Sequence, residues 1–402
     1  MDVRRHRPIL SGLLPTVRRA NDEKVRRAAL RSTIAIASSP GIPSRRRFAW
    51  SRRSRDLVAP PSVRISECLT RGRGRWHLAR RPQPVHRISP SSLGSQTLHL
   101  PLPRTWPEVG VLELDGGRVF GSHGWVMDLE GAVLPELSWY GAPSDRIRVP
   151  SPMPAALELD GTCLSLVSDW SCRNYSHFLL DSLGRLAVFF DAGFSIADVD
   201  HVYCPTPPSA AAAHVFERFD VPAEKRVWAE SMKLVSAKAL FVPSLPSAAL
   251  AYPPWLPQFL RGVMGLTDGS LGERRLYVSR RGYGRQASSE QELHALLLDQ
   301  GFEIYDGTDE RSRPEDFDQA AVVVGAHGAG LANLAFCRPG TRVIEIIPTD
   351  NAHPFYYSLA LAAQLDYGYL VGRSIVEREA GAFGPSPYDF DVDLDELAAA
   401  LA

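Results

Sequence analysis

One histidine stands in a run of small residues between two apolar segments. The sequence from Ala320 to Ile347 reads AAVVVGAHGAGLANLAFCRPGTRVIEII. Its glycines permit a sharp turn and the close approach of a ligand to the backbone. A helix that starts after the turn would direct its free N–H groups at an anion. We predict that His327, Gly328, Ala329 and Gly330 bind a phosphate or a sugar. A structural turn with a capping histidine is the alternative.

An arginine-rich loop follows another predicted strand, in the sequence LYVSRRGYGR that starts at Leu276. Guanidinium groups bind phosphate oxygens in a paired geometry. Arg280 and Arg285 are therefore candidates for holding a diphosphate. A solvated basic loop is the alternative.

A polar stripe runs along the predicted helix 174–190. His177, Asp181 and Arg185 follow one another at intervals of four, which places them on one face of a helix. Asn174 lies one turn earlier. Such a stripe is commonly a solvated helix face. A contacting His and Asp pair can also take a proton from a hydroxyl group, so His177 and Asp181 are candidate catalytic residues.

Strands and helices alternate through the last third of the chain. Predicted strands at LYVSR, FEIY, AVVVG, RVIEII and YGYLVG are separated by predicted helices, among them 289–300 and 354–365. This alternation indicates right-handed crossovers and a doubly wound parallel sheet, so the fold class is α/β. Ligands bind such sheets at the carboxyl ends of the strands, where both the histidine turn and the arginine loop are expected.

The chain divides by composition into four predicted regions. Residues 1–92 are a basic arm, 93–250 an α/β domain, 251–375 the domain of the doubly wound sheet, and 376–402 a C-terminal tail or helix. Residues 1–90 carry 22 Arg and Lys against 5 Asp and Glu and are rich in Pro and Ser, so we expect the arm to be disordered.

Two roles are considered for this arm. It is expected to be an extension without a folded role, or to make a weak contact with an anionic membrane surface. Binding to nucleic acid is not expected, because aromatic residues are sparse in the arm and no recognition motif accompanies its charge.

Several other chemistries lack their sequence signatures. No GxSxG nucleophile turn occurs, and the 5 cysteines include no CxxC pair, which argues against a zinc site and fits a cytoplasmic location. No apolar run is long enough to span a membrane. The DxD sequences at 198–200 and 391–395 are assigned to surface charge, so no metal site is expected. The turn GAHGAG departs from the dinucleotide-binding pattern GxGxxG. Glu345 follows Gly325 by 20 residues, however, so a dinucleotide-binding site stays an alternative.

Three blocks of the sequence resemble glycosyltransferase family 61, the capsular-polysaccharide-type glycosyltransferases. The block N-x-x-H-[WF]-L-x-D-x-L-x-R matches residues 174–185. The block Y-x-S-R…R…N-E, followed by G-F, matches 277–302, with Ser289 in place of the usual asparagine. The block H-G-A-G-L-x-N-x-x-F…P-G…I-E matches 327–345. Gly184 and Ala326 stand where the family commonly has proline.

The resemblance implies a GT-B-like fold, in which two Rossmann-like domains face a cleft. It also implies inverting transfer from a nucleotide sugar, without a metal or a cofactor. Arg280, Arg285 and the turn 327–330 would then hold the donor diphosphate. Glu345 would accept hydrogen bonds from the ribose hydroxyls, and Asn333 would fix the turn.

On the acceptor side we expect Asp181 to be the catalytic base, with His177 orienting it or serving as the base itself. Asn174 and Arg185 would support this side of the site. By analogy with the family, the acceptor is a hydroxyl group of a glycan or a lipid-linked glycan in the synthesis of a surface polysaccharide. The protein would then work in the cytoplasm or at the inner face of the membrane.

Two other classes of function stay open from the sequence. One is a non-catalytic module that binds a nucleotide or a sugar on the same fold, with the His and Asp stripe as plain surface. The other is a dinucleotide-dependent oxidoreductase. Fold alone does not decide among them.

Overall fold

The computed structural model describes residues 56–86, 88–138, 147–247, 251–306, 313–376 and 388–402. The described residues of 58–149 and 153–402 form one compact unit, and residues 56–57 and 150–152 belong to another. Two short pairs of strands stand apart from the main sheets: β1 (Asp56–Val58) with β9 (Val149–Ser151), and β3 (Gln83–Pro84) with β5 (Thr105–Trp106). Among the described residues, no helix combines the length and the apolar character needed to cross a bilayer.

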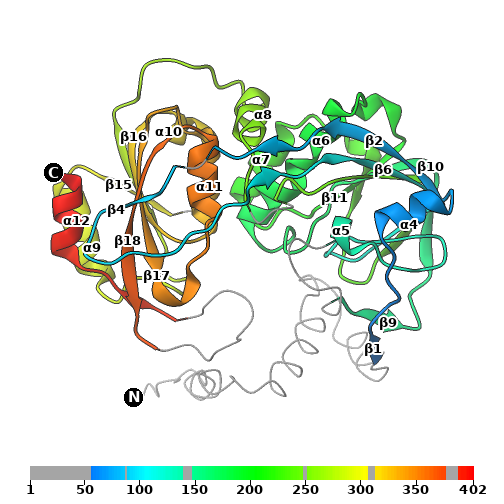
Figure 1. The fold of residues 1–402 in the computed structure, drawn as a ribbon, viewed down its shortest axis with the longest axis horizontal. Helices are drawn as coiled ribbons and strands as arrows, with labels where there is room; N and C mark the ends of the chain where they lie inside the picture. The colour runs from blue at the N-terminus through cyan, green and yellow to red at the C-terminus, as the bar shows by residue number, and fades with distance from the viewer. Residues whose placement is uncertain (1–55, 87, 139–146, 248–250, 307–312, 377–387) are drawn as a thin grey trace, which may run out of the picture. The chain divides into compact units, whose positions relative to one another are not determined.

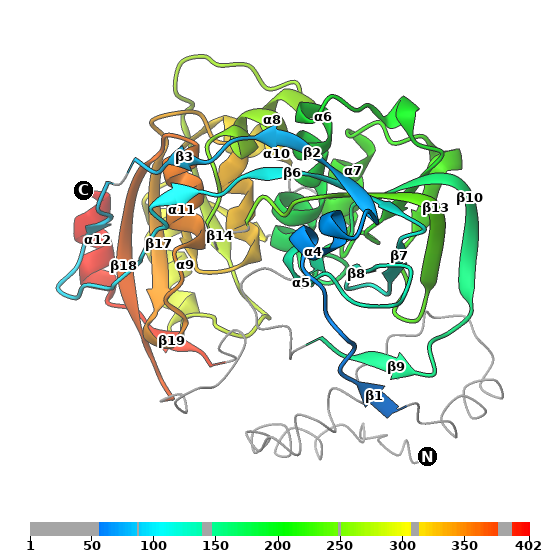
Figure 2. The ribbon, with the colours of Figure 1, turned by 45° about the vertical axis from the view of Figure 1, so that its right-hand side comes forward.

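The first sheet contains eight of the described strands. Its main path is β12 (Arg226–Trp228), β11 (His201–Cys204), β10 (Ala156–Ser165), β13 (Leu234–Pro243), β6 (Val109–Asp115) and β2 (Gly74–Arg80). β7 (Arg118–Phe120) pairs with β13, and β8 (Trp125–Met127) pairs with β7. The four strands from β12 to β13 are parallel. β6 is antiparallel to both β13 and β2. Figure 2 shows β6 beside β2.

Helical segments connect these strands and precede the first sheet. They are α4 (Ile65–Thr70), α5 (Pro135–Ser138), η2 (His177–Leu183), α6 (Arg185–Asp191), η3 (Ile196–Asp198), α7 (Ala210–Glu217) and η4 (Ala223–Lys225). Segment η2 is a π-helix rather than the α-helix that the sequence predicts. Such wider turns are rare and occur frequently at functional sites.

The second sheet is the parallel sheet that the sequence predicts. Its path is β15 (Glu303–Asp306), β14 (Arg274–Ser279), β16 (Ala320–Ala326), β17 (Arg342–Pro348), β18 (Asp366–Ser374) and β19 (Phe390–Asp391), with β4 (Ser91–Ser92) beside β18. All of these neighbours are parallel except β18 and β19. The connecting helices are α8 (Trp255–Val263), α9 (Glu290–Asp299), α10 (Pro314–Asp318), η5 (Ala329–Phe336), η6 (Thr349–Asn351), α11 (Phe355–Ala362) and α12 (Leu394–Leu401).

Both faces of this second sheet are covered, as doubly wound sheets require. Leu293 of α9 and Leu397 of α12 pack in one apolar cluster with Val324 of β16. Val323, one residue earlier, belongs to the cluster on the other face with Phe317 of α10. Figure 1 shows the sheet between these two groups of helices.

The order of the strands in the second sheet locates a binding edge. The chain starts at β14, goes to β15 on one side, and then continues through β16 and β17 on the other side. The connections therefore reverse direction between β14 and β16, and ligands of open α/β sheets bind beyond the carboxyl ends of the strands at such a switch point. Arg280 follows β14 directly and His327 follows β16 directly, so both stand at this point.

The prediction of a disordered arm over 1–92 is wrong for its last part. Residues 1–55 lie outside the described residues, but β2 joins the first sheet and β4 joins the second. β2 pairs with β6 over most of its length, and Cys68 of α4 is fully buried. This segment has few apolar side chains of its own, and it is ordered because it completes the edges of sheets built by later residues.

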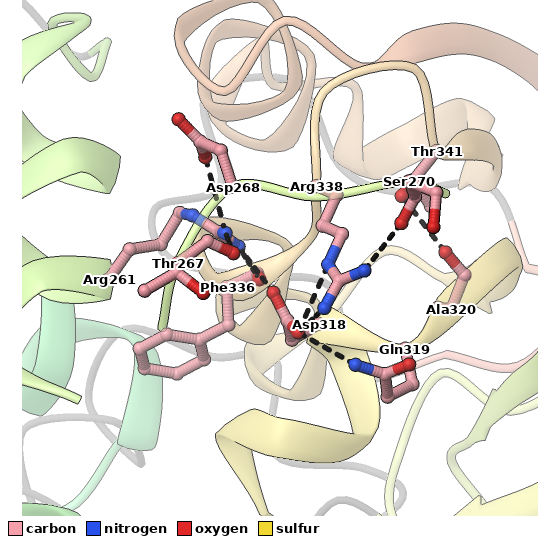
Figure 3. Close-up of polar contacts among 10 residues, drawn as sticks. All are labelled: Arg261, Thr267, Asp268, Ser270, Asp318, Gln319, Ala320, Phe336, Arg338 and Thr341. Carbon is pink, nitrogen blue, oxygen red and sulfur yellow. Dashed lines mark hydrogen bonds and ion pairs between the residues drawn. The ribbon is translucent and has the colours of Figure 1, made fainter. Parts of the chain in front are cut away.

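A buried ion-pair network lies at the opposite end of β16 from His327 (Figure 3). Asp318 accepts from Nη1 of Arg261 at 3.0 Å through one oxygen, and from Nη2 of Arg338 at 2.6 Å through the other. Asp318 is 4% exposed and Arg261 is 7% exposed. Burial raises the pKa of Asp318, but the hydrogen bonds from the two arginines outweigh burial, and the net pKa is lowered.

Asp318→Ala is therefore expected to lower the free energy of unfolding by about 3–5 kcal/mol, because it leaves the buried Arg261 without its buried carboxylate partner. The lowered pKa means that the charged pair stabilises the fold above the ordinary carboxyl pKa. This contribution is lost as the pH falls through the lowered value. Urea unfolding at about pH 7 and about pH 3 measures this. The difference in the free energy of unfolding between wild type and variant should be smaller at about pH 3.

Asp268→Asn is the matched control for this network, because Asp268 faces the same Arg261 at 3.5 Å with a side chain that is 88% exposed. It should change stability by less than about 1 kcal/mol. An equal loss in both variants would show that the buried position of Asp318 is not what matters.

Candidate active site

The arginine loop and the histidine turn meet at the switch point, as predicted. Gly328 is so close to Arg280 that a Cβ built on it would lie 1.7 Å from the arginine Nη1. The loop holds the same guanidinium from the other side, because Arg280 donates from Nη2 to the carbonyl of Gly284 at 2.6 Å and from Nε to that of Arg285 at 3.1 Å. Within the part of the chain that the structure describes, no carboxylate forms an ion pair with Arg280.

This charge at Arg280 is largely enclosed. Burial lowers the pKa of Arg280, and neighbouring tyrosines oppose the shift. A buried cation without a carboxylate partner is costly, and an anionic ligand would offset that cost. Arg285, at the end of the loop, has a left-handed backbone with a φ of 64° and is partly exposed.

His327 is fixed by a carboxylate behind it. Its Nδ1 lies 2.6 Å from Oε1 of Glu345, and the other oxygen of Glu345 accepts from the hydroxyl of Tyr367 at 2.6 Å. Glu345 is fully buried, and burial next to that carboxylate holds the pKa of Tyr367 well above its ordinary value. The sequence assigns Glu345 to the ribose, but its two oxygens are both used inside the protein, so the geometry favours a role in orienting His327.

The turn after His327 leads into η5, as the sequence predicts, but η5 is a 3-10 helix. Ala329 and Gly330 start it and are partly exposed, whereas Asn333 is buried. Asn333 accepts from the hydroxyl of Tyr175 at 2.7 Å, which ties η5 to the residues just before η2. Its Nδ2 is buried, with no hydrogen-bond partner among the described residues.

Tyr356 of α11 joins the candidate residues, although the sequence motifs do not include it. Its ring centroid lies 5.0 Å from that of His327. Burial raises the pKa of Tyr356 to about 12. A hydrogen bond with Ser176 and the nearby charges of Arg285 and Arg280 act in the opposite direction. Ser176 directly precedes His177, so Tyr356 connects the histidine turn with the polar stripe. The sequence gives no signal for this contact beyond the aromatic content of the helix.

The pair of His177 and Asp181 forms as predicted, with Nδ1 of His177 2.6 Å from Oδ2 of Asp181. The other oxygen of Asp181 accepts from the hydroxyl of Ser247. Asp181 is fully buried, whereas the side chain of His177 is 16% exposed. His177 is therefore the member that can reach a substrate, and Asp181 holds it in place. Asn174 caps the helix start by accepting from the N–H groups of Ser176 and His177 at 2.9 and 3.4 Å.

Arg185, the third predicted member of the polar stripe, is not exposed at the surface. It is fully buried, and burial lowers the pKa of its guanidinium. The nearby charge of Asp181 has the opposite effect on this pKa. Its guanidinium donates to the carbonyls of Val167 at 3.1 Å, Ser165 at 3.4 Å and Leu137. Arg185 therefore fixes the end of β10, the backbone that follows it, and α5.

Comparison with known proteins bears on this site. Residues 175–344 match the model of the family described as Glycosyltransferase 61. The resemblance to glycosyltransferase family 61 is confirmed. The matched range contains the polar stripe, the arginine loop and the histidine turn, and it ends one residue before Glu345. The description of that family names a glycosyltransferase activity.

A relative from rice, Oryza sativa subsp. japonica, matches over a shorter stretch. Beta-1,2-xylosyltransferase RCN11 is 41% identical over 49 residues, which cover 12% of this chain and 9% of the rice protein. The aligned segment is therefore a small part of either protein.

Proposed function

We propose that the protein transfers a sugar from a nucleotide-sugar donor to a hydroxyl group of a glycan, with inversion and without a metal ion. The observation that carries the proposal is the guanidinium of Arg280 against the backbone of Gly328, at the switch point of a parallel sheet. A diphosphate fits a cation that forms no ion pair with a carboxylate of the described residues, next to a turn position without a Cβ, Gly328.

On the donor side, Arg280 and Arg285 would neutralise the charge that develops on the leaving nucleoside diphosphate. The turn from Gly328 to Gly330 would add backbone N–H groups, and His327 would reach a phosphate or the sugar with Nε2. Each charge-assisted hydrogen bond of this kind contributes about 1.5–3 kcal/mol. Fixed cations can stabilise the leaving group in the place of a metal ion. The second sheet would then be the donor half of a GT-B-like fold.

On the acceptor side, we assign His177 as the base and Asp181 as the residue that orients it. The acceptor oxygen attacks the anomeric carbon while its proton passes to the imidazole of His177. The bond from the anomeric carbon to the diphosphate oxygen breaks on the opposite face of the sugar, so the configuration inverts. The exposure of His177 and the burial of Asp181 support this assignment over the reverse one.

Several finer features stay proposals. The name of the rice relative specifies a xylosyltransferase, so a pentose donor is the first candidate, with a hexose donor next. The acceptor would be a glycan or a lipid-linked glycan of a surface polysaccharide, used in the cytoplasm or at the inner face of the membrane. A contact of the basic arm with an anionic membrane would suit this location, and residues 1–55 of that arm lie outside the described residues.

Arg280→Ala is expected to weaken the binding of a nucleoside diphosphate by about 10-fold to 100-fold, because one charge-assisted contact is lost. Titration calorimetry with UDP, GDP, ADP and dTDP measures this directly. Arg281→Ala is the control, since Arg281 is the exposed neighbour of Arg280 in the same loop. Equal affinities of wild type and Arg280→Ala for every nucleotide would remove Arg280 from the donor site.

A further inference from the structure

A second pair of histidine and aspartate lies near the polar stripe, outside the three motif blocks. His123, in the turn between β7 and β8, contacts Oδ1 of Asp169 through Nδ1. The side chain of Asp169 is fully buried, whereas that of His123 is 31% exposed. Oδ2 of Asp169 is buried and has no hydrogen-bond partner in the described part of the chain.

An aromatic ring completes the surroundings of His123. Trp125 stacks on the imidazole, with ring centroids 4.9 Å apart and an interplanar angle of 17°. The Nε1 of Trp125 is also buried without a partner among the described residues. Two buried polar atoms without partners around one histidine are unusual, because such groups are nearly always hydrogen-bonded in folded proteins. Sites that bind ligands are one place where they persist.

Trp170 is exposed directly beside this pair. It is 37% exposed and has a φ of 66°, a left-handed conformation that residues with a Cβ rarely adopt. Unfavourable backbone conformations of this kind cluster at functional sites.

The loop that carries Asp169 and Trp170 runs along the helix that carries His177. At the start of the loop, the N–H of Ser168 donates to the hydroxyl oxygen of Ser182 at 3.0 Å. Farther along the loop, the carbonyl of Trp170 accepts from the N–H of Asn174 at 2.9 Å. Asp169 is therefore held between two contacts with this helix, and Trp170 lies just before the helix, seven residues before the proposed base His177.

We propose that Trp170 and His123 form the subsite that holds the acceptor sugar. The C–H face of a pyranose ring would pack on the indole of Trp170, and one of its hydroxyl groups would hydrogen-bond to Nε2 of His123. Aromatic side chains provide apolar area with a defined orientation, and the histidine adds direction. The acceptor class is then a pyranoside with one apolar face. The inference rests on the proposed function, because it places this sugar beside His177.

The test measures glycoside binding separately from nucleotide binding. Saturation-transfer difference NMR with the methyl β-glycosides of xylose, glucose and galactose and methyl α-mannoside probes the wild type. Trp170→Asn removes the ring while keeping a residue that tolerates the left-handed backbone. His123→Gln removes the imidazole, and Trp170→Phe keeps an aromatic face. Phe190→Ala is the control, because Phe190 is another exposed aromatic residue, at 40%, on α6.

We expect at least one glycoside to bind the wild type, and Trp170→Asn and His123→Gln to bind it about 10-fold more weakly. Trp170→Phe and Phe190→Ala should stay within about threefold of the wild type. Calorimetry with nucleoside diphosphates should be unchanged in all four variants.

Two results overturn the subsite: no glycoside binds the wild type, or Trp170→Asn binds as the wild type does. Failure of the proposed function gives a different pattern, in which no nucleoside diphosphate binds the wild type whatever the glycosides do. If Trp170→Asn does not fold, His123→Gln alone decides, and unchanged binding by it contradicts the proposal.

Discussion

Gly328→Ala is expected to lower nucleotide-sugar turnover by about 100-fold or more while leaving the fold intact. Gly328 has a φ of 176°, an extended backbone that alanine adopts without strain. The new Cβ would lie 1.7 Å from Nη1 of Arg280, at the far end of a flexible side chain. The guanidinium must therefore leave the turn, and the added methyl group takes the space that a phosphate would use.

Gly262→Ala is the matched control for this substitution. Gly262 lies in α8, and no atom comes within 4 Å of a Cβ built on it. Alanine is favoured over glycine in a helix by about 1 kcal/mol, so this variant should be as stable as the wild type or slightly more stable. Thermal unfolding and kcat/KM of both variants separate the two effects. Equal turnover in Gly328→Ala and Gly262→Ala would show that Arg280 does not need its place against the turn.

His177→Gln is expected to reduce sugar transfer by about 100-fold to 10,000-fold, the usual contribution of a positioned base. Asp181→Asn should also reduce transfer, because an amide does not hold the imidazole in the same tautomer and orientation. Neither variant should change the affinity for a nucleoside diphosphate, since the pair lies on the acceptor side. Single-turnover kinetics together with calorimetry measure both quantities.

The exposed His214 of α7 provides the control, and His214→Gln should turn over as the wild type does. The pair of active-site variants also decides between the two assignments of the base. Normal transfer by His177→Gln with loss in Asp181→Asn would make Asp181 the base, against the geometry. Normal transfer by both would remove the pair from the chemistry.

The proximity of Arg280 and His327, which we propose as the donor side, could be predicted from the sequence because it depends on strand ends. Parallel strands place their carboxyl ends along one edge, so Arg280 after β14 and His327 after β16 had to lie close together. The role of Glu345 could not be predicted in the same way. Glu345 lies in the middle of β17, and only the side-chain packing shows that its oxygens contact His327 and Tyr367.

The surroundings of His177, which we propose as the acceptor side, could be predicted less completely, because their geometry depends on local backbone form and on contacts distant in sequence. The contact between His177 and Asp181 forms within a π-helix, and a spacing of four does not distinguish this helix type from an α-helix. The spacing also does not predict that Arg185 is buried. Tyr356 reaches the site from α11, 180 residues after Ser176. The order of residues 56–86 and 88–92 arises in the same way, from strands supplied by distant parts of the chain.

The central claim is that Arg280 and the turn at Gly328 hold the diphosphate of a sugar donor during transfer. The release of nucleoside diphosphate from UDP-, GDP-, ADP- and dTDP-linked sugars, followed by chromatography, tests it most directly. We predict slow release from at least one donor by the wild type, faster release when a glycan acceptor is added, and loss of both in Gly328→Ala. Binding of nucleotides without release from any donor would contradict the claim and leave a non-catalytic binding module.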